Sequence, residues 1–278
     1  HIKGGLGTLA TLVHERAEKV GVTFHLNSPV ASIDVKKGKA KGITLDSGEV
    51  IEADAVIANA DASLIYNTLI KAKLRKIKKV RKNIAKADPS LAGFSLLLGM
   101  RKDGSEPLNH HTVLFPKDYD AEFDAIFTHK QPVTEPTIYI CAPRDESMSK
   151  DELLEGWFVL VNAPAHGQES FDWNDAEFAR KYANTIIDQI EARGISVRSR
   201  LESITIRTPA DLESAVRAPG GSIYGTSSNG ARAAFMRAKN RSPIKGLYCV
   251  GGSAHPGGGL PLVGLSAEMV ANAIGSAQ

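Results

Sequence analysis

Residues 251–261 carry the side chains and backbone best suited to binding a cofactor. This segment contains five glycines and two prolines, so its main chain can approach a ligand closely. An apolar run at 247–250 predicts a buried strand before it. After it, Leu262, Leu265, Met269 and Ala273 recur at helical spacing and predict the apolar face of a helix, with Pro261 as a first-turn residue. A strand, a glycine-rich turn and a helix N-terminus together form an anion site. The alternative interpretation is a glycine-rich connection between two core elements.

His255 is the imidazole of this segment and the first candidate catalytic residue; His110 and His111 are weaker candidates, because paired histidines at a strand start are often partly exposed. It can orient a cofactor or receive a proton, and a structural hydrogen bond within the loop is the alternative. The two cysteines, Cys141 and Cys249, lie in apolar strand-like runs, which favours reduced, buried thiols and a cytosolic location. The eight histidines show no zinc spacing, so the sequence predicts no metal site.

The same segment resembles the C-terminal flavin-binding signature of the bacterial and fungal phytoene desaturases, the carotenoid desaturase family. The matching pattern runs Gly246-Leu247-Tyr248, then His255-Pro256-Gly257-Gly258-Gly259, then Leu260-Pro261. Residues 220–225 and Asn240-Arg241-Ser242 resemble the segment that leads into this signature. Further similarity lies in His110-His111 before a strand and in residues 136–143 and 157–161. The resemblance covers nearly the whole chain.

The resemblance implies FAD as the cofactor and assigns residues to its binding. Gly4 and Gly5 would approach the flavin from the side, and the strand near Val30 would lie against the adenosine end, although Val30 is more typical of ordinary core. Gly5-x-Gly7-x-x-Ala10 formally satisfies the dinucleotide fingerprint, but that motif requires a preceding strand, so we reject it. The remaining implied contacts are Gly251, Gly252, Ser253, Gly259, Leu260, Pro261, Leu262 and Val263.

The implied activity is FAD-dependent dehydrogenation of a long polyene such as phytoene. Such a reaction needs orientation, a dry apolar cavity and stabilisation of negative charge on the reduced ring, which the helix from Leu262 can supply. Two alternatives stay open. One is another flavin oxidoreductase of the superfamily, for example a carotenoid isomerase, a retinol saturase or an amine oxidase. The other is a non-catalytic module that binds lipid surfaces.

Hydrophobic periodicity predicts an α/β chain. We expect a remnant of a FAD-binding, glutathione-reductase-like domain at 1–61 and 240–278, and an inserted substrate domain on a mixed sheet at 62–239. Typical family members begin with a strand and G-x-G-x-x-G, which hold the flavin pyrophosphate. Because that unit is not in this sequence, we expect a part of a longer enzyme that binds FAD weakly or not at all by itself.

Helices are predicted at 8–20, 172–192, 208–213 and from 262, and strands at 22–26, 29–35, 40–45, 50–53, 55–58, 91–100, 111–115, 137–142, 157–162, 197–206 and 247–250.

One stretch of the chain, residues 71–86, is strongly basic and contains no acidic residue. Leu74, Ile77, Val80 and Ile84 recur through it at helical spacing, so it predicts a basic amphipathic helix, which can lie on an anionic membrane surface. A solvated helix face is the alternative. Nucleic-acid binding is not expected, since no aromatic residue interleaves the charges and the net charge of the chain is only +3. The basic residues are Lys71, Lys73, Arg75, Lys76, Lys78, Lys79, Arg81, Lys82 and Lys86.

Overall fold

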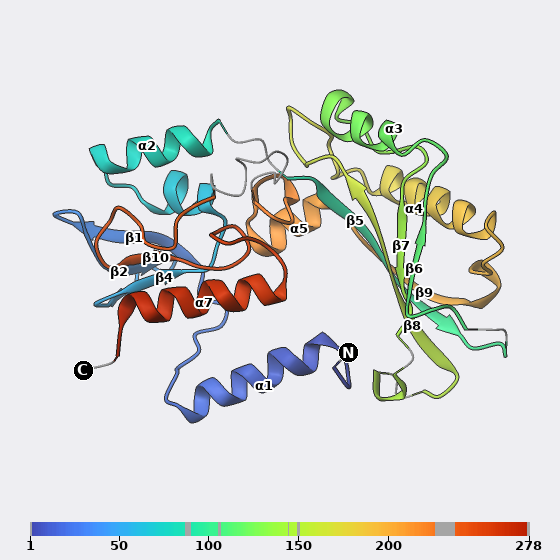
Figure 1. Cartoon of the computed structure of the whole chain (residues 1–278), viewed down its shortest axis with the longest axis horizontal. Helices are drawn as coiled ribbons and strands as arrows, with labels where there is room; N and C mark the ends of the chain where they lie inside the picture. Colours follow the sequence, from blue (N-terminus) through green and yellow to red (C-terminus); the bar gives the residue numbers. More distant parts are fainter. Residues whose placement is uncertain are drawn as a thin grey trace. The chain divides into compact units, whose positions relative to one another are not determined.

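The computed structural model describes residues 2–86, 90–104, 107–143, 145–148, 151–225 and 237–276. The chain is an α/β protein, as predicted, and it divides into two compact units (Figure 1). The first unit comprises residues 1–26, 93–164 and 170–208, and the second comprises residues 27–92, 165–169 and 209–278. These two units are defined by contacts within the chain. The predicted division into a flavin domain (1–61 and 240–278) and a substrate domain (62–239) concerns function, and it stays a prediction.

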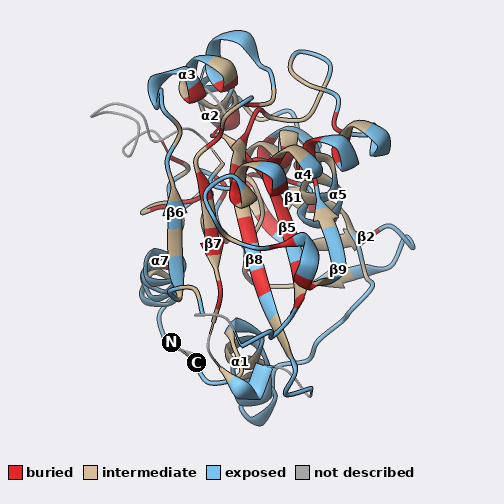
Figure 2. Ribbon diagram, turned by 90° about the vertical axis from the view of Figure 1, so that its right-hand side faces the viewer, coloured by how far each residue is buried: buried red, intermediate tan, exposed pale blue. Residues whose placement is uncertain are grey.

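The first unit is built on a five-stranded sheet in the order β6-β7-β8-β5-β9. The pairings β6–β7, β7–β8 and β5–β9 are antiparallel. Figure 2 shows that buried residues follow β5, β7 and β8, whereas the edge strands β6 and β9 are largely open to solvent. The strands are β5 (Ala92–Arg101), β6 (His111–Leu114), β7 (Ile138–Cys141), β8 (Leu154–Ala163) and β9 (Leu201–Arg207).

Helix α4 (Ala176–Glu191) packs on this sheet through aromatic side chains. The Asp175 carboxylate accepts hydrogen bonds from the first-turn N–H groups of Glu177 and Phe178 and so begins the helix. The ring of Tyr182 meets that of Phe94 on β5 edge to face, at 5.0 Å between centroids. The other helices of the unit are α1 (Leu6–Lys19), α3 (Asp120–Phe123), the π-helix Asp124–His129, and the 3-10 turns Glu146–Met148 and Arg198–Arg200.

The second unit contains the expected antiparallel meander of β1 (Val30–Lys36), β2 (Lys39–Leu45) and β3 (Val50–Glu52). Its other sheet is a parallel pair, β4 (Val56–Ala58) with β10 (Leu247–Cys249), in which Leu247 lies opposite Val56 and Cys249 opposite Ala58. The helices are the π-helix Leu64–Leu69, α2 (Arg75–Ile84), α5 (Pro209–Val216), the 3-10 turn Pro219–Gly221 and α7 (Leu260–Ile274).

Two strand predictions and one prediction of a buried cysteine were wrong. Residues 22–26 form no strand, and Val22, Phe24 and Leu26 are exposed. Residues 197–200 precede β9 as a turn, in which Arg200 pairs with Glu155 at 2.6 Å. Cys141 is only half-buried, whereas Cys249 is buried as expected.

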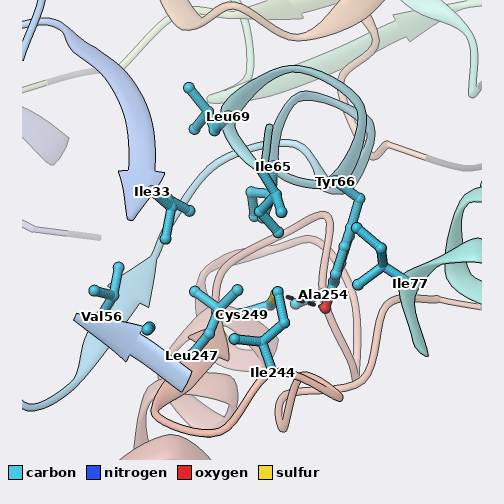
Figure 3. Close-up of a cluster of buried hydrophobic side chains, with 12 residues drawn as sticks. Ile33, Val56, Ile65, Tyr66, Leu69, Ile77, Ile244, Leu247, Cys249 and Ala254 are labelled. Carbon is cyan, nitrogen blue, oxygen red and sulfur yellow. Dashed lines mark hydrogen bonds between the residues drawn. The ribbon is translucent and has the colours of Figure 1, made fainter. Parts of the chain in front are cut away.

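The core of the second unit joins the parallel strand pair to the π-helix (Figure 3). Ile65 and Tyr66 of the π-helix face Leu247 and Cys249 of β10, and the Tyr66 hydroxyl lies 3.7 Å from the Cys249 sulfur. Ala254, from the glycine-rich segment, is also part of this cluster. The glycine-rich segment is therefore anchored in the hydrophobic core.

Candidate functional site: a glycine-rich loop between a strand and a helix

The glycine-rich loop, residues 250–259, connects the end of β10 to the first turn of α7. The strand–loop–helix order predicted from the sequence is therefore confirmed, and Pro261 lies in the first turn of α7. The loop contains a cis peptide bond between His255 and Pro256. An added Cβ would be crowded at two of its glycines, Gly251 and Gly258, whereas at Gly252 and Gly257 it would make ordinary van der Waals contacts.

Two loop positions leave little room for a side chain. A Cβ on Gly251 would lie 2.1 Å from Oδ1 of Asn59, and the φ of Gly251 is +95°. A Cβ on Gly258 would lie 2.3 Å from the ring of Tyr224. At Gly251 both the backbone conformation and the close neighbour require glycine, and at Gly258 the close neighbour does.

Asn240 ties the two ends of the loop together. Its side-chain nitrogen lies 3.1 Å from the carbonyl oxygen of Cys249, 2.8 Å from that of His255 and 3.0 Å from Oγ of Ser266 on α7. The Ser266 hydroxyl, which is fully buried, also accepts the Gly251 N–H at 3.3 Å. One amide thus connects the strand, the loop and the helix.

Arg237 supports the loop from the other side. Its guanidinium, 6% exposed, donates to the carbonyl oxygens of Tyr224 at 2.7 Å and Gly252 at 2.9 Å. Burial lowers the pKa of Arg237 below its ordinary value. These bonds join the main chain at Tyr224 to the glycine-rich loop, and the Tyr224 ring lies close to Gly258.

Ser253 connects the loop to the end of β4. Its hydroxyl donates to Oδ2 of Asp61 at 2.8 Å and accepts the Ala62 N–H at 3.1 Å. The other carboxylate oxygen of Asp61 accepts from the N–H and the hydroxyl of Ser63. The segment 59–61 after β4 and the glycine-rich loop after β10 therefore meet at the carboxyl ends of two parallel strands, where open α/β sheets bind ligands.

The first turn of α7 faces solvent and has no side-chain cap. Gly259, at the N-cap, has a φ of +98°, and Leu260, Pro261 and Leu262 are exposed. An uncapped N-terminus presents N–H donors and the positive end of the helix dipole. A backbone cradle built of glycines that leads into such a terminus fits a flavin, whose ring carries negative charge when reduced.

The predicted apolar face of α7 is not the buried one. Leu262, Leu265 and Met269 are 41%, 44% and 38% exposed, whereas Ser266 and Val270 are buried. Asn240 explains the difference, because its bond to Ser266 turns a polar residue inward.

The structure brings together the predicted binding residues Gly251, Gly252, Ser253, Gly259, Leu260, Pro261, Leu262 and Val263, all within one strand–loop–helix segment. His255 belongs to the same segment, and its main chain is held on both sides, by Ala238 at its N–H (2.9 Å) and by Asn240 at its carbonyl. Val30 begins β1, where its carbonyl accepts from Arg217. Their roles toward a flavin stay predictions.

Gly4 and Gly5 belong to the other compact unit. Both have a φ of +80°, and the Gly4 N–H donates to Oδ2 of Asp145 at 2.7 Å. Hydrogen bonds from Ser147 and then from Gly4 lower the pKa of Asp145. Residues 3 and 4 form a turn just before α1.

The parallel strand pair, the glycine-rich loop and the uncapped helix define an α/β protein with a glycine-rich loop at the carboxyl ends of two parallel strands. The chain belongs to the family described as flavin containing amine oxidoreductases, whose family model matches residues 1–158. That match ends before the glycine-rich loop. The loop region is instead covered by individual relatives, which align with nearly the full chain.

Three of these relatives are carotenoid desaturases. Hydroxyneurosporene desaturase of Rubrivivax gelatinosus is 32% identical and matches 98% of this chain and 51% of its own length. The 1-hydroxycarotenoid 3,4-desaturase of Flavobacterium sp. (strain P99-3) is 34% identical, with 98% of this chain and 54% of its own length matched. The zeta-carotene-forming phytoene desaturase of Myxococcus xanthus is 34% identical, with corresponding shares of 96% and 51%. The chain spans about half the length of these relatives.

A solved structure supports the fold. An oxidoreductase from Methanosarcina mazei superposes with a TM-score of 0.64 over 96% of this chain and 54% of the other, at 18% identity. Within the described residues, no helix combines the length and the apolar character needed to cross a bilayer.

Proposed function

We propose that this chain is the C-terminal part of a FAD-dependent carotenoid desaturase, which dehydrogenates a polyene such as phytoene. The observation that carries the proposal is the glycine-rich loop, held by Asn240, Ser266 and Arg237 and ending at the uncapped terminus of α7. Relatives named as carotenoid desaturases align with this whole region. The alternatives of a carotenoid isomerase, a retinol saturase, an amine oxidase or a non-catalytic module have no such observation in their favour.

The residues of this chain would act by positioning and by electrostatics. When bound, FAD supplies the acceptor for the hydride removed from an activated C–H bond. Gly251, Gly252 and Ser253 would hold the cofactor edge through their main chain. The N–H groups at the start of α7 would stabilise negative charge on the reduced ring. His255 would hold or receive a proton close to the loop.

We further propose that α2 contacts an anionic membrane surface peripherally. Its apolar side chains pack against the core of their own unit, so they are not available to enter a bilayer; they are Leu74, Ile77, Val80 and Ile84. The Arg81 guanidinium is not available to bind lipid headgroups either, since it donates to the carbonyls of Tyr66 and Ile70 at 2.7 and 2.8 Å. The exposed lysines remain, so the contact would be electrostatic and would involve no insertion into the bilayer.

The proposed activity is tested by complementation. The chain is first titrated with FAD, and then co-expressed with an upstream segment that carries a strand and G-x-G-x-x-G, after which conversion of phytoene and of hydroxyneurosporene is measured. We expect weak or no FAD binding by the chain alone, and FAD binding with desaturation after complementation.

Two results would contradict the proposal in different ways. Tight stoichiometric FAD binding by the chain alone would show that the site is complete without an upstream segment. FAD binding after complementation without desaturation of any carotenoid, but with oxidation of amines, would assign the chain to another branch of the family.

A further inference from the structure

Two histidines and a cysteine that lie far apart in the sequence meet at the edge of the five-stranded sheet. His111 begins β6, and Cys141 ends β7 directly opposite it in the antiparallel register. Residues directly opposite each other in an antiparallel pair place their side chains on the same face. His110 precedes the strand, and its ring lies 4.4 Å from that of His111, measured between centroids.

The side-chain ligand atoms of these three residues all lie within 4.8 Å of one another. Tetrahedral zinc, with bonds of about 2.0–2.3 Å, requires ligand atoms separated by about 3.3–3.8 Å. From the 4.8 Å upper limit, the largest contraction needed is about 1–1.5 Å, which small side-chain rotations can supply, because His111 is exposed and His110 and Cys141 are half-buried.

Tyr139 supplies a second layer of contacts. It lies two residues before Cys141 on β7 and therefore points to the same face. Its hydroxyl lies 2.8 Å from Nδ1 of His111, the two rings are stacked at 5.9 Å, and the hydroxyl also contacts the Cys141 thiol. Partners of this kind orient metal-binding imidazoles and are part of most metal sites.

The chemistry of the ligand set selects the metal. Two imidazoles and a thiolate suit a borderline-soft cation of the zinc type, and three protein ligands leave one coordination position open. The face is accessible, since β6 is an edge strand and its outward residues His111 and Val113 are exposed. On binding, the Cys141 thiol releases its proton to solvent, and no electron is transferred.

We propose that His110, His111 and Cys141 form a binding site for a zinc-type divalent cation, which ties the edge strand β6 to β7. The site is separate from the glycine-rich loop and lies in the other compact unit. The sequence alone did not indicate it, because the histidine pair and the cysteine are about 30 positions apart and only the register of β6 and β7 aligns them.

The test uses the metal-free chain without a histidine tag, titrated with Co²⁺ as a spectroscopic substitute for zinc. We expect a thiolate-to-cobalt charge-transfer band that one equivalent of Zn²⁺ abolishes. Cys141→Ser should remove the band, whereas Cys249→Ala should keep it. His111→Ala should weaken Zn²⁺ affinity by at least about tenfold, Tyr139→Phe by roughly tenfold, and the exposed control His129→Ala should leave it unchanged.

A second measurement avoids any variant. Bound Zn²⁺ should slow alkylation of Cys141 by a thiol reagent, followed by peptide mass mapping of the wild-type chain. Absence of a thiolate band in the wild type, an equal loss of the band in Cys249→Ala, or unchanged alkylation of Cys141 at saturating Zn²⁺ would each overturn the proposal.

Discussion

At the scale of single residues, the glycine-rich loop depends on positions where a methyl group cannot fit. Gly251→Ala would place Cβ 2.1 Å from Asn59 at a φ of +95°. The left-handed conformation alone costs a non-glycine residue about 1–2 kcal/mol. We therefore expect Gly251→Ala to lower the melting temperature and to weaken FAD binding in the complemented protein by at least about tenfold.

Gly264→Ala is the matched control for this substitution. Gly264 lies inside α7, and no atom outside its own helix turn is within 4 Å of the position that an added methyl group would take. Alanine in a helix interior stabilises by roughly 0.5–1 kcal/mol relative to glycine. Equal losses of FAD binding in the two variants would show that the loop geometry is not what the cofactor requires.

The glycines of the loop could be predicted from the sequence, but the residues that hold them could not. Glycine and proline act locally, so their clustering at 251–261 is visible in the chain itself. Asn240 and Arg237 act through carbonyl oxygens 9 to 15 positions away, and Ser266 reads as one polar residue in an apolar helix. What pointed to Asn240 in the sequence was its place in Asn240-Arg241-Ser242, the segment that leads into the flavin-binding signature.

At the scale of secondary-structure elements, α2 offers a charge-dependent test of membrane contact. Lys76→Glu combined with Lys79→Glu reverses two exposed charges of α2. Each basic residue near an anionic surface contributes about 1 kcal/mol, so we expect binding to phosphatidylserine vesicles to fall by at least about tenfold. The control pair, Arg180→Glu with Lys181→Glu, makes the same charge change on exposed positions of α4. Equal effects of the two pairs in vesicle sedimentation would contradict a specific role for α2.

The β10 strand carries a pH-dependent contribution to stability through Cys249. Burial raises the pKa of this thiol, so the folded chain keeps its proton at pH values where the unfolded chain loses it. The contribution of this thiol to the free energy of unfolding is therefore fully present below its ordinary pKa of about 8.5 and declines as the pH rises above that value. Cys249→Ala should flatten the decline of unfolding free energy between about pH 8.5 and 10, measured by urea titration. An unchanged slope would mean that other groups cause the decline.

Element types followed from the sequence where a local pattern was sufficient. The meander, the helix at 75–84 and the strand–loop–helix of residues 247–274 are confirmed. The run at 22–26 has strand composition, but a strand also needs a partner for its backbone groups, and no described strand pairs with it. The prediction of the buried face of α7 was wrong because the helix is apolar on several sides, and the hydrogen bonds that Ser266 accepts from Asn240 and Gly251 turn this polar residue inward.

At the scale of the whole molecule, the two compact units carry different spectroscopic probes. Both tryptophans, Trp157 and Trp173, are in the first unit, and Asn240 is in the second. Asn240→Ala would leave buried carbonyl groups without their donor, at a cost of about 1–3 kcal/mol. We expect it to shift the unfolding curve measured by far-UV circular dichroism and to leave the tryptophan fluorescence curve in place.

The control for this experiment is Asn184→Ala, an exposed position on α4, which should shift neither curve. If Asn240→Ala moved both curves by the same amount, the two units would unfold as one cooperative body.

The parallel pairing of β4 with β10 has a consequence for the chain during its synthesis. Val56 meets Leu247, so β4 leaves the ribosome long before its partner exists. At roughly 5–20 residues per second, the delay is about 10–40 s. During this time the pairing edge of β4 and the apolar side chains of the π-helix have no β10 to cover them. The nascent polypeptide therefore presents an incomplete, aggregation-prone core throughout this delay, and protection by a holding chaperone during it would raise the yield of folded protein.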